Sequence, residues 1–162
     1  MRASEVVVVD PLPRLTVRTG DATVDAMAAD LQARSRYVQA DATQQLDTLG
    51  EFDLVVCDNV IDHSQEPAAI LREARRLVAP GGRLLFGVNV FSTLGIAKWR
   101  YVTRKLHPSA TNVLCHPQSF VEPSLRAMVS ACGWSVSAWS GASSLQRHAG
   151  KAYRVRLVAS PV

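Results

Sequence analysis

Apolar residues in this chain gather into short runs of strand length, separated by polar residues and turn formers. The first run, Val6 to Val9, consists entirely of β-branched residues, which is the composition of a strand covered on both faces in a parallel sheet. Three further runs have the length and composition of strands: Arg36 to Ala40, Phe52 to Cys57 and Arg83 to Val88. We therefore expect parallel strands here, with the first of them buried.

Helical spacing appears between these runs. Apolar residues recur at intervals of three and four from Val24 to Leu31, and Asp21 or Thr23 can cap the start of this helix. A second helix is predicted over Glu66 to Val78, because Pro67 suits a first turn and arginines collect toward the other end. Pro80-Gly81-Gly82 is expected to stop that helix and turn the chain into the next strand. Strand, helix and parallel strand in succession predict a βαβ crossover in an α/β fold.

The last third of the chain predicts one helix and two strands. The helix carries Leu125, Met128, Val129 and Cys132 on one face, with Pro123 in its first turn and Gly133 at a left-handed C-cap. Strands are expected over Trp134 to Trp139 and Tyr153 to Ala159. The second alternates apolar residues with arginines, which predicts a face partly open to solvent and antiparallel pairing.

Composition favours one soluble globular domain over residues 1–162, since 48% of the residues are hydrophobic and 20% are charged. No apolar run approaches the roughly 20 residues that span a bilayer, and no secretory leader is evident, so we expect a cytoplasmic protein. The three cysteines form no Cys-x-x-Cys pair, which argues against a disulfide framework. Cys115-His116, with His107 upstream, lacks a second ligand pair at zinc-like spacing, and no metal is expected.

Positive charge is concentrated in one segment of a chain whose net charge is +4. Between Lys98 and Lys105, two aromatic residues alternate with four cations, a composition suited to nucleic-acid contacts. The simpler interpretation, which we favour, is a solvated helix or loop. The irregular segment 89–118 around it is longer than the usual connection in a compact domain and is expected to be a substrate-covering insert or lid.

Polar side chains stand where the predicted strands end. Asp10 follows the first strand and Asp41 the second, while the third ends in the run Asp58-Asn59-Val60-Ile61-Asp62-His63. Open α/β sheets bind ligands at the carboxyl ends of their strands, so we look for the site there and expect these residues to share one rim. A single acid at such a place is usually a loop or cap residue, but three strand ends of this kind favour a site.

The order of these motifs resembles the class I S-adenosylmethionine-dependent methyltransferases, in particular the methyltransferase type 11 pattern, over most of residues 5 to 159. The matching pieces are Val-Val-Val-Val-Asp10-Pro11-Leu12, Val-Gln-Ala-Asp41-Ala42, Asp-Asn59-Val-Ile-Asp62-His63, Ala-Pro-Gly-Gly-Arg-Leu-Leu-Phe-Gly-Val-Asn89, and His116-Pro-Gln-Ser-Phe120. The resemblance implies a Rossmann-like sheet, mostly parallel, with an antiparallel C-terminal strand pair.

The resemblance also implies the cofactor, S-adenosyl-L-methionine, and the residues that bind it. Asp10 would accept hydrogen bonds from the ribose hydroxyls, Leu12 would pack on the adenine, and Asp41 would contact the adenine amino group. Asn59 and Val60 would lie along the amino acid end of the cofactor. The implied cofactor-binding residues are Asp10, Pro11, Leu12, Asp41, Ala42, Asn59 and Val60.

Methyl transfer needs the partners held in line, and it needs a base only if the acceptor carries a proton. His63 or Asp62 is the candidate base, because imidazole and carboxylate groups both serve as general bases. An equally weighted alternative is that His63 only positions the substrate or caps the following helix.

The sequence departs from the family because it has no first strand and no Gly-x-Gly loop, which would lie between the strands at Val6 and Phe52. We expect the chain to be truncated at its N-terminus and those two strands to close up and pair directly, with pairing to another chain in a homo-oligomer as an alternative. Thr43, where relatives often carry a glutamate, and the short link from Gln44 to Gly50 weaken the match on the adenine side.

Three functions follow from these patterns. The leading one is methyl transfer to a small-molecule or glycan-like acceptor. The first alternative is an inactive truncated remnant, or a binding module without cofactor. Nucleic-acid methylation through Lys98 to Lys105 is a lesser alternative. Nicotinamide dinucleotide binding shares the acid at a strand end, but it leaves the run from Asn59 to His63 without a role.

Overall fold

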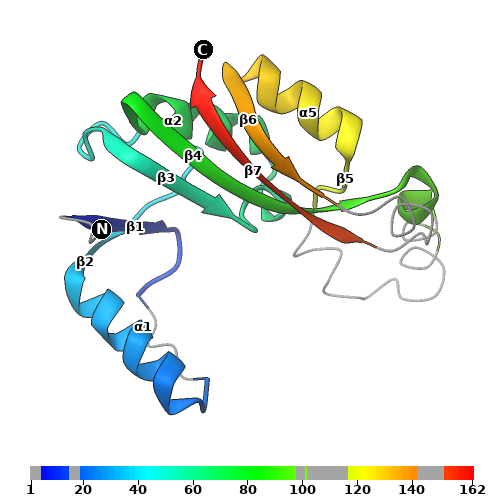
Figure 1. The fold of residues 1–162 in the computed structure, drawn as a ribbon. Helices are drawn as coiled ribbons and strands as arrows, with labels where there is room; N and C mark the ends of the chain where they lie inside the picture. Colours follow the sequence, from blue (N-terminus) through cyan, green and yellow to red (C-terminus); the bar gives the residue numbers. More distant parts are fainter. Residues whose placement is uncertain (1–4, 15–18, 98–100, 102–116, 142–151) are drawn as a thin grey trace. The chain divides into compact units, whose positions relative to one another are not determined.

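The computed structural model describes residues 5–14, 19–97, 101, 117–141 and 152–162. The chain divides into two compact units, Met1–Gln45 and Leu46–Val162, and each is described by itself (Figure 1). The expectation of a single domain stays a prediction.

The first unit is a strand–helix–strand motif. β1 (Val6–Asp10) and β2 (Ser35–Gln39) pair in parallel, and α1 (Ala22–Arg34) connects them. Asp21 is the N-cap, since its Oδ1 accepts the backbone N–H groups of Thr23 and Val24 at 2.9 and 3.1 Å. β1 is half-buried, not buried as expected, because two strands and one helix cannot cover both faces of a strand.

The second unit is built on a five-stranded sheet in which β3 (Phe52–Asp58), β4 (Val78–Phe91), β7 (Tyr153–Pro161) and β6 (Trp134–Ser140) follow one another. The short β5 (Phe120–Val121) also pairs with β4. β3 and β5 are parallel to β4, whereas β7 is antiparallel to both β4 and β6. These pairings confirm the mostly parallel strands with an antiparallel C-terminal pair.

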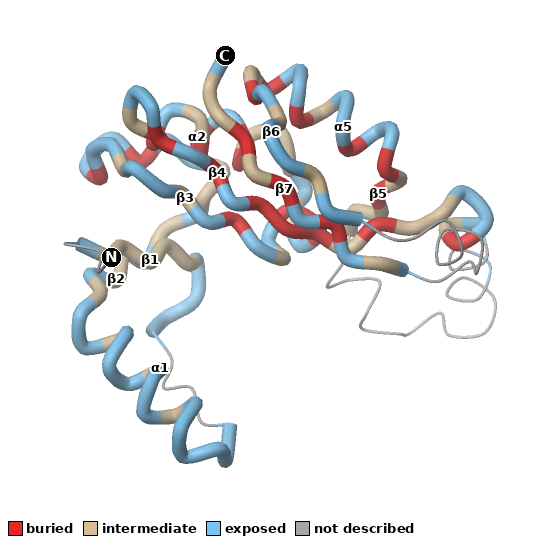
Figure 2. Tube along the Cα trace, viewed as in Figure 1, coloured by how far each residue is buried: buried red, intermediate tan, exposed pale blue. Residues whose placement is uncertain are grey.

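The helices of this unit whose bounds are described are the short 3-10 helix η1 (Ile61–His63), α2 (Pro67–Leu77) and α5 (Glu122–Ala131), and residues 93–97 are also helical. α2 and α5 bury their apolar faces, and further buried residues lie on η1 and on all five strands, most of them on β4 and β7 (Figure 2). The side chains of Leu54, Val56 and Leu85 remain exposed. The core of this unit therefore lies between the sheet and its two longer helices.

α5 is fixed to the sheet by a polar cluster as well as by its apolar face. Glu122, in its first turn, is buried and accepts hydrogen bonds from Arg126 at 2.9 Å and from the Tyr153 hydroxyl of β7 at 3.2 Å. The guanidinium of Arg126 also stacks 3.7 Å from the centre of the Trp139 ring in β6. Trp134 of β6 donates its indole N–H to the carbonyl of Leu71 in α2 at 3.0 Å.

Pro80-Gly81-Gly82 does not separate α2 from a later strand, as the sequence had indicated. β4 begins at Val78, directly after α2, and Val78 lies opposite Phe52 of β3. The next paired residues are Leu54 and Arg83, so the Pro-Gly-Gly run is an irregularity inside the strand. Gly82 fits there because a Cβ would come 2.9 Å from the carbonyl oxygen of Phe52. The prediction was wrong because Val78 keeps its pairing with β3 across the irregularity.

The predicted pairing between Val6 to Val9 and Phe52 to Cys57 stays a prediction, because the two strands belong to different units. Among the described strands, β1 pairs with β2 alone and β3 with β4 alone, in separate sheets. Each strand forms backbone hydrogen bonds along one edge with a strand of its own unit. The sequence pattern does not specify which strand pairs with the other edge.

Several predicted features fall outside the described residues. These are most of the segment 89–118, with the Lys98 to Lys105 cluster apart from Tyr101, and His107, Cys115 and His116. In the described part of the chain, no helix combines the length and apolar character needed to cross a bilayer.

Candidate functional site

The acids of the first unit follow neighbouring parallel strands at the same sheet edge. Asp10 ends β1, and its backbone carbonyl accepts the N–H of Ala40, just beyond β2, at 3.1 Å. Each carboxylate also fixes its own turn, since Asp10 Oδ1 accepts the N–H of Leu12 and Asp41 Oδ1 that of Thr43, both at 2.8 Å. The structure thus brings together Asp10 and Asp41, as expected from the sequence.

Side chains of β2 hold the turn after Asp10. The Tyr37 hydroxyl donates to the carbonyl of Leu12 at 2.7 Å, and the Gln39 amide donates to that of Pro11 at 3.3 Å. Partial burial, together with the negative charge of Asp10, raises the pKa of Tyr37 and keeps its hydroxyl protonated as a donor. The Leu12 side chain is 59% exposed, so it is available to a flat apolar ligand.

In the second unit, the chain turns sharply at the end of β3. Asn59 has a φ of 61°, in the left-handed region that asparagine tolerates better than most residues. Its backbone N–H donates to the carbonyl of Gly87 in β4 at 2.7 Å. This turn directs the chain into η1, which carries Asp62 and His63.

Both ends of the Asn59 side chain are engaged. Its Oδ1 accepts a hydrogen bond from the Asn89 amide at 3.1 Å, and its Nδ2 lies 3.3 Å from Nε2 of His63. Sequence reasoning did not select Asn89 as a site residue. The signal was present, because Asn89 interrupts the apolar run of β4 in the same way that Asp10 ends that of β1.

The two candidate bases differ in exposure. Asp62 is buried, whereas His63 on the same turn is exposed. Val60, proposed from the sequence beside the cofactor, is 39% exposed. Of the two titratable side chains, only that of His63 faces solvent, where an acceptor would arrive.

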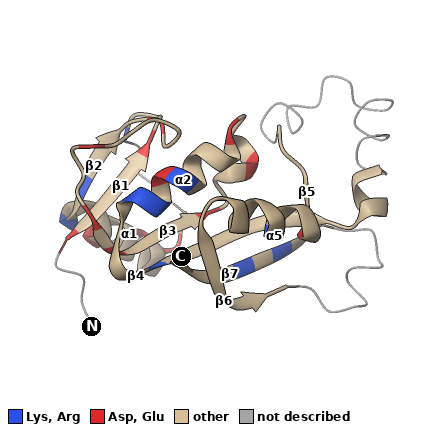
Figure 3. Ribbon diagram, turned by 90° about the horizontal axis from the view of Figure 1, so that it is seen from above, with Lys and Arg blue, Asp and Glu red and all other residues tan. Residues whose placement is uncertain are grey.

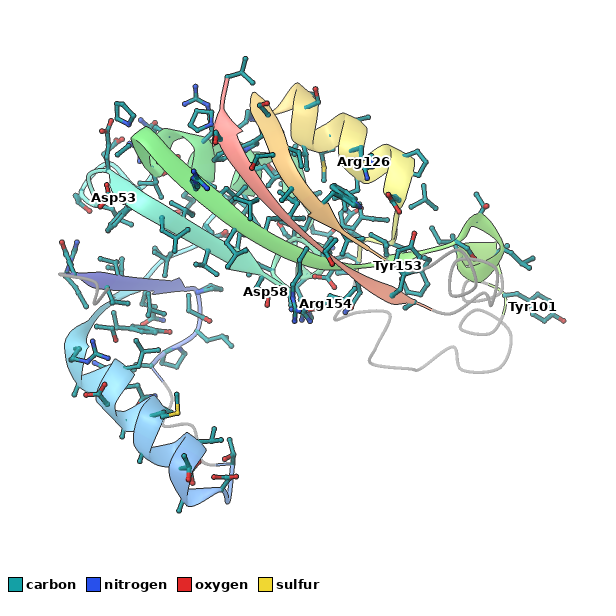
Figure 4. All side chains as sticks on the ribbon, in the orientation of Figure 1. Asp53, Asp58, Tyr101, Arg126, Tyr153 and Arg154 are labelled. Carbon is teal, nitrogen blue, oxygen red and sulfur yellow. The ribbon has the colours of Figure 1, made fainter. Side chains whose placement is uncertain are left out.

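An ion pair crosses the sheet next to this turn. Asp58 of β3 pairs with Arg154 of β7, although β4 lies between these strands (Figure 4). The carboxylate passes over Gly87 of β4, where an added Cβ would overlap Asp58 Oδ1. Arg154 belongs to the basic face of β7, coloured blue in Figure 3.

Cys57 stands beside the site but is not suited to nucleophilic chemistry. Burial raises the pKa of its thiol to about 12, and the carboxylates of Asp58 and Asp62 add to the rise. The thiol is therefore neutral at physiological pH and packs as a core residue.

Each unit assembles its own strand-end residues. Asp10 with Asp41, and Asn59 with His63 and Asn89, form two polar clusters. The expectation that Asp10, Asp41 and Asn59 share one rim stays a prediction, as do the ligand contacts assigned to Pro11, Ala42 and Val60.

Comparison with known proteins supports one family. A family model described as "Methyltransferase domain" matches residues 2–86, which include Asp10, Asp41, Asn59 and His63. A demethylmenaquinone methyltransferase of Mycolicibacterium vanbaalenii is 31% identical over 137 residues, covering 74% of this chain and 58% of that protein. The matched part of the chain thus spans little more than half of this relative.

Solved structures show the same fold. The N-methyltransferase NodS of Bradyrhizobium japonicum, in complex with S-adenosylhomocysteine, matches 97% of this chain and 66% of its own, with a TM-score of 0.60 at 14% identity. A Burkholderia thailandensis 1,6-didemethyltoxoflavin N1-methyltransferase matches 98% of this chain and 61% of its own, with a TM-score of 0.60 at 17% identity.

Proposed function

The chain belongs to the methyltransferase domain family, and on this premise we propose that it transfers a methyl group from S-adenosyl-L-methionine to a small-molecule or glycan-like acceptor. The observation that carries the proposal is the family match over residues 2–86, which contains the acids after β1 and β2 and the run from Asn59 to His63. The named relatives methylate small organic molecules such as demethylmenaquinone and 1,6-didemethyltoxoflavin, which supports this class of acceptor.

The residues after β1 and β2 fit the adenosine part of this cofactor. A carboxylate has about four acceptor positions, so Asp10 can bind two ribose hydroxyls while Oδ1 keeps the N–H of Leu12. Asp41 offers a second carboxylate close by, and the exposed Leu12 offers an apolar surface for a purine. We assign the ribose to Asp10, the adenine amino group to Asp41 with the backbone of Ala42, and the ring face to Pro11 and Leu12.

In the second unit, Asn59 and Val60 are assigned to the amino acid end of the cofactor. The side chain of Asn59 is engaged by Asn89 and His63, and its N–H by Gly87. We therefore assign its contribution to binding to the Asn59 backbone carbonyl. The Val60 carbonyl accepts the N–H of His63 at 3.1 Å and has a second acceptor position for the cofactor.

The bound cofactor would supply an electrophilic sulfonium methyl group. The protein then has to hold the acceptor in line and, where the acceptor carries a proton, remove that proton. His63 is the group that we assign to proton removal, because it is exposed at the end of β3 and Asp62 is buried.

Calorimetry with S-adenosylmethionine and S-adenosylhomocysteine tests the cofactor assignment. We expect saturable binding that Asp10→Ala weakens at least tenfold, because a charged hydrogen-bond acceptor contributes about 1.5–3 kcal/mol. Asp30→Asn is the matched control, since Asp30 lies on α1 and pairs with Arg34 on the surface. A folded chain that shows no heat with either compound contradicts the proposal and favours a module without cofactor.

Methyl transfer to a panel of small acceptors, with demethylmenaquinone included, tests the reaction. For an acceptor whose reacting atom carries a proton, His63→Ala is expected to lower kcat by roughly a hundredfold or more, the usual contribution of a general base. The affinity for the cofactor should stay within about twofold of the wild-type value, as expected for a group that acts only on the acceptor. An unchanged kcat removes His63 from the role of base.

A further inference from the structure

The amide groups of Asn89 and Asn59 form a hydrogen-bonded chain that ends on the ring of His63. Asn89 lies near the end of β4, Asn59 at the turn after β3, and His63 on η1, so three elements meet in this chain. Both contacts lie within hydrogen-bond reach, at 3.1 Å from Asn89 to Asn59 and 3.3 Å from Asn59 to His63. All three residues belong to the second unit.

The direction of the first hydrogen bond determines the second. An amide nitrogen only donates and an amide oxygen only accepts. Asn89 donates from Nδ2 to Asn59 Oδ1, which turns the Nδ2 of Asn59 toward His63. Nε2 of His63 must then accept, and the proton of the neutral ring lies on Nδ1.

We propose that Asn89 is a positioning residue that, acting through Asn59, holds His63 in the tautomer with Nδ1 protonated and Nε2 as the acceptor. This inference rests on the proposed function in one respect, namely that His63 removes a proton from the methyl acceptor. The tautomer itself is inferred from the amide chain and does not depend on the proposed function.

The tautomer decides which ring nitrogen can serve as base. At 3.3 Å, the contact from Asn59 is long for a hydrogen bond, so an acceptor hydroxyl or amine can replace it. The proton of the acceptor then passes to Nε2. Its bonding electron pair stays on the acceptor atom, which forms the new bond to the methyl carbon as the bond between that carbon and the cofactor's sulfur breaks.

Asn89→Asp reverses the direction of the hydrogen bonds that link residues 89, 59 and 63, with almost no change in side-chain size. A carboxylate only accepts, so Asn59 must give its Nδ2 to residue 89 and turn its Oδ1 toward His63. His63 must then donate from Nε2. The proposal therefore expects the ring proton to move from Nδ1 to Nε2 in this variant.

The control is Asp58→Asn, which removes one negative charge at the end of β3, whereas Asn89→Asp adds one near the end of β4. Asp58 pairs with Arg154 and takes no part in the contacts that link Asn89, Asn59 and His63. If the hydrogen-bonded chain sets the tautomer, His63 keeps its wild-type tautomer in this variant. If nearby charge sets the wild-type tautomer, removal of the Asp58 carboxylate changes that tautomer.

Long-range proton–nitrogen correlation spectra of the full chain with isotope-labelled histidine give the measurement. They are recorded without ligands at a pH where the ring is neutral, and His63→Gln identifies the signals of His63 among the four histidines. The expected result is a protonated Nδ1 in the wild type and in Asp58→Asn, and a protonated Nε2 in Asn89→Asp. The same tautomer in the wild type and Asn89→Asp, or a change in Asp58→Asn equal to that in Asn89→Asp, overturns the proposal. Backbone amide spectra establish that each variant is folded.

A kinetic arm connects the tautomer to the reaction. Asn89→Asp should lower kcat at least tenfold for an acceptor that carries a proton, with cofactor affinity unchanged. Complete absence of methyl transfer in the wild type argues against the proposed function and leaves the tautomer result standing. Normal transfer in both proteins, with an unchanged tautomer, overturns the positioning role alone.

Discussion

At Gly87, the second unit has no room for a side chain, because Asp58 lies where a Cβ would be. Asp58 extends across this position to Arg154, so Gly87→Ala must displace the carboxylate and weaken the ion pair. The pair is partly exposed, and we expect a loss of about 1 kcal/mol or less in the free energy of unfolding.

A double-mutant cycle separates this clash from other effects of alanine. In an Asp58→Ala background the added methyl group meets no carboxylate, and Gly87→Ala should become neutral or slightly stabilising, since alanine suits a strand interior better than glycine. Denaturant unfolding of the four proteins gives the coupling. Equal effects of Gly87→Ala in both backgrounds would refute the explanation.

Glu73 links α2 to the segment before β3 through its charge. Its carboxylate is buried and accepts hydrogen bonds from the N–H of Leu46 at 2.7 Å and from Arg76 at 2.6 Å. The hydrogen bond from Arg76 holds the pKa of Glu73 below its usual value, although burial opposes this. Stability from this group is therefore present above about pH 4.5 and is lost as the pH falls through the lowered pKa.

Glu73→Gln tests this dependence. We expect the variant to be less stable than the wild type by about 1–3 kcal/mol at pH 7, because a buried charged hydrogen bond is weakened. The difference should shrink as the pH falls below 4.5 through the lowered pKa, because the wild-type carboxylate then takes up its proton as well. Denaturant titrations over a series of pH values from 7 downward measure it, and a difference that does not change with pH argues against a role of the charge.

At the scale of elements, α2 is the most amphipathic of the described helices α1, α2 and α5. Leu71 is fully buried in it, and Arg72 next to it is exposed. Leu71→Ala should lower the free energy of unfolding by about 2–5 kcal/mol, since it leaves a cavity, whereas Arg72→Ala should stay within about 0.5 kcal/mol. Similar losses for both would show that α2 is not held by its apolar face.

Periodicity predicted most elements because their determinants are local. Asp21 caps α1 through its own side chain, and Gly133 has the φ of 80° that a left-handed C-cap requires. Which strand pairs with the second edge of β1 is not predictable from periodicity, since the hydrophobic pattern of a strand does not name its neighbour. Asn89 was overlooked for a similar reason, because its role depends on Asn59 and His63, which are distant in the sequence.

For the whole molecule, the two units differ in how much core they contain. None of the described residues in Met1–Gln45 is buried, whereas Leu46–Val162 buries residues on η1, α2, α5 and all five strands of its sheet. A two-stranded sheet with one helix is at best marginally stable alone. We expect the separate fragment 46–162 to unfold cooperatively and fragment 1–45 to show little secondary structure by circular dichroism. The opposite result would mean that the core of the second unit does not suffice.

The packing of Trp134 and Trp139 gives the chain a natural optical reporter. All three tryptophans follow residue 45, and these two lie in distinct surroundings, one hydrogen-bonded in the core and one beneath a guanidinium. Intrinsic indole emission of the intact chain therefore records melting of the second unit and is silent on the first, whose described aromatic residue is Tyr37. A spectral shift on heating, compared with loss of helical ellipticity, will distinguish sequential from concerted melting of the two units.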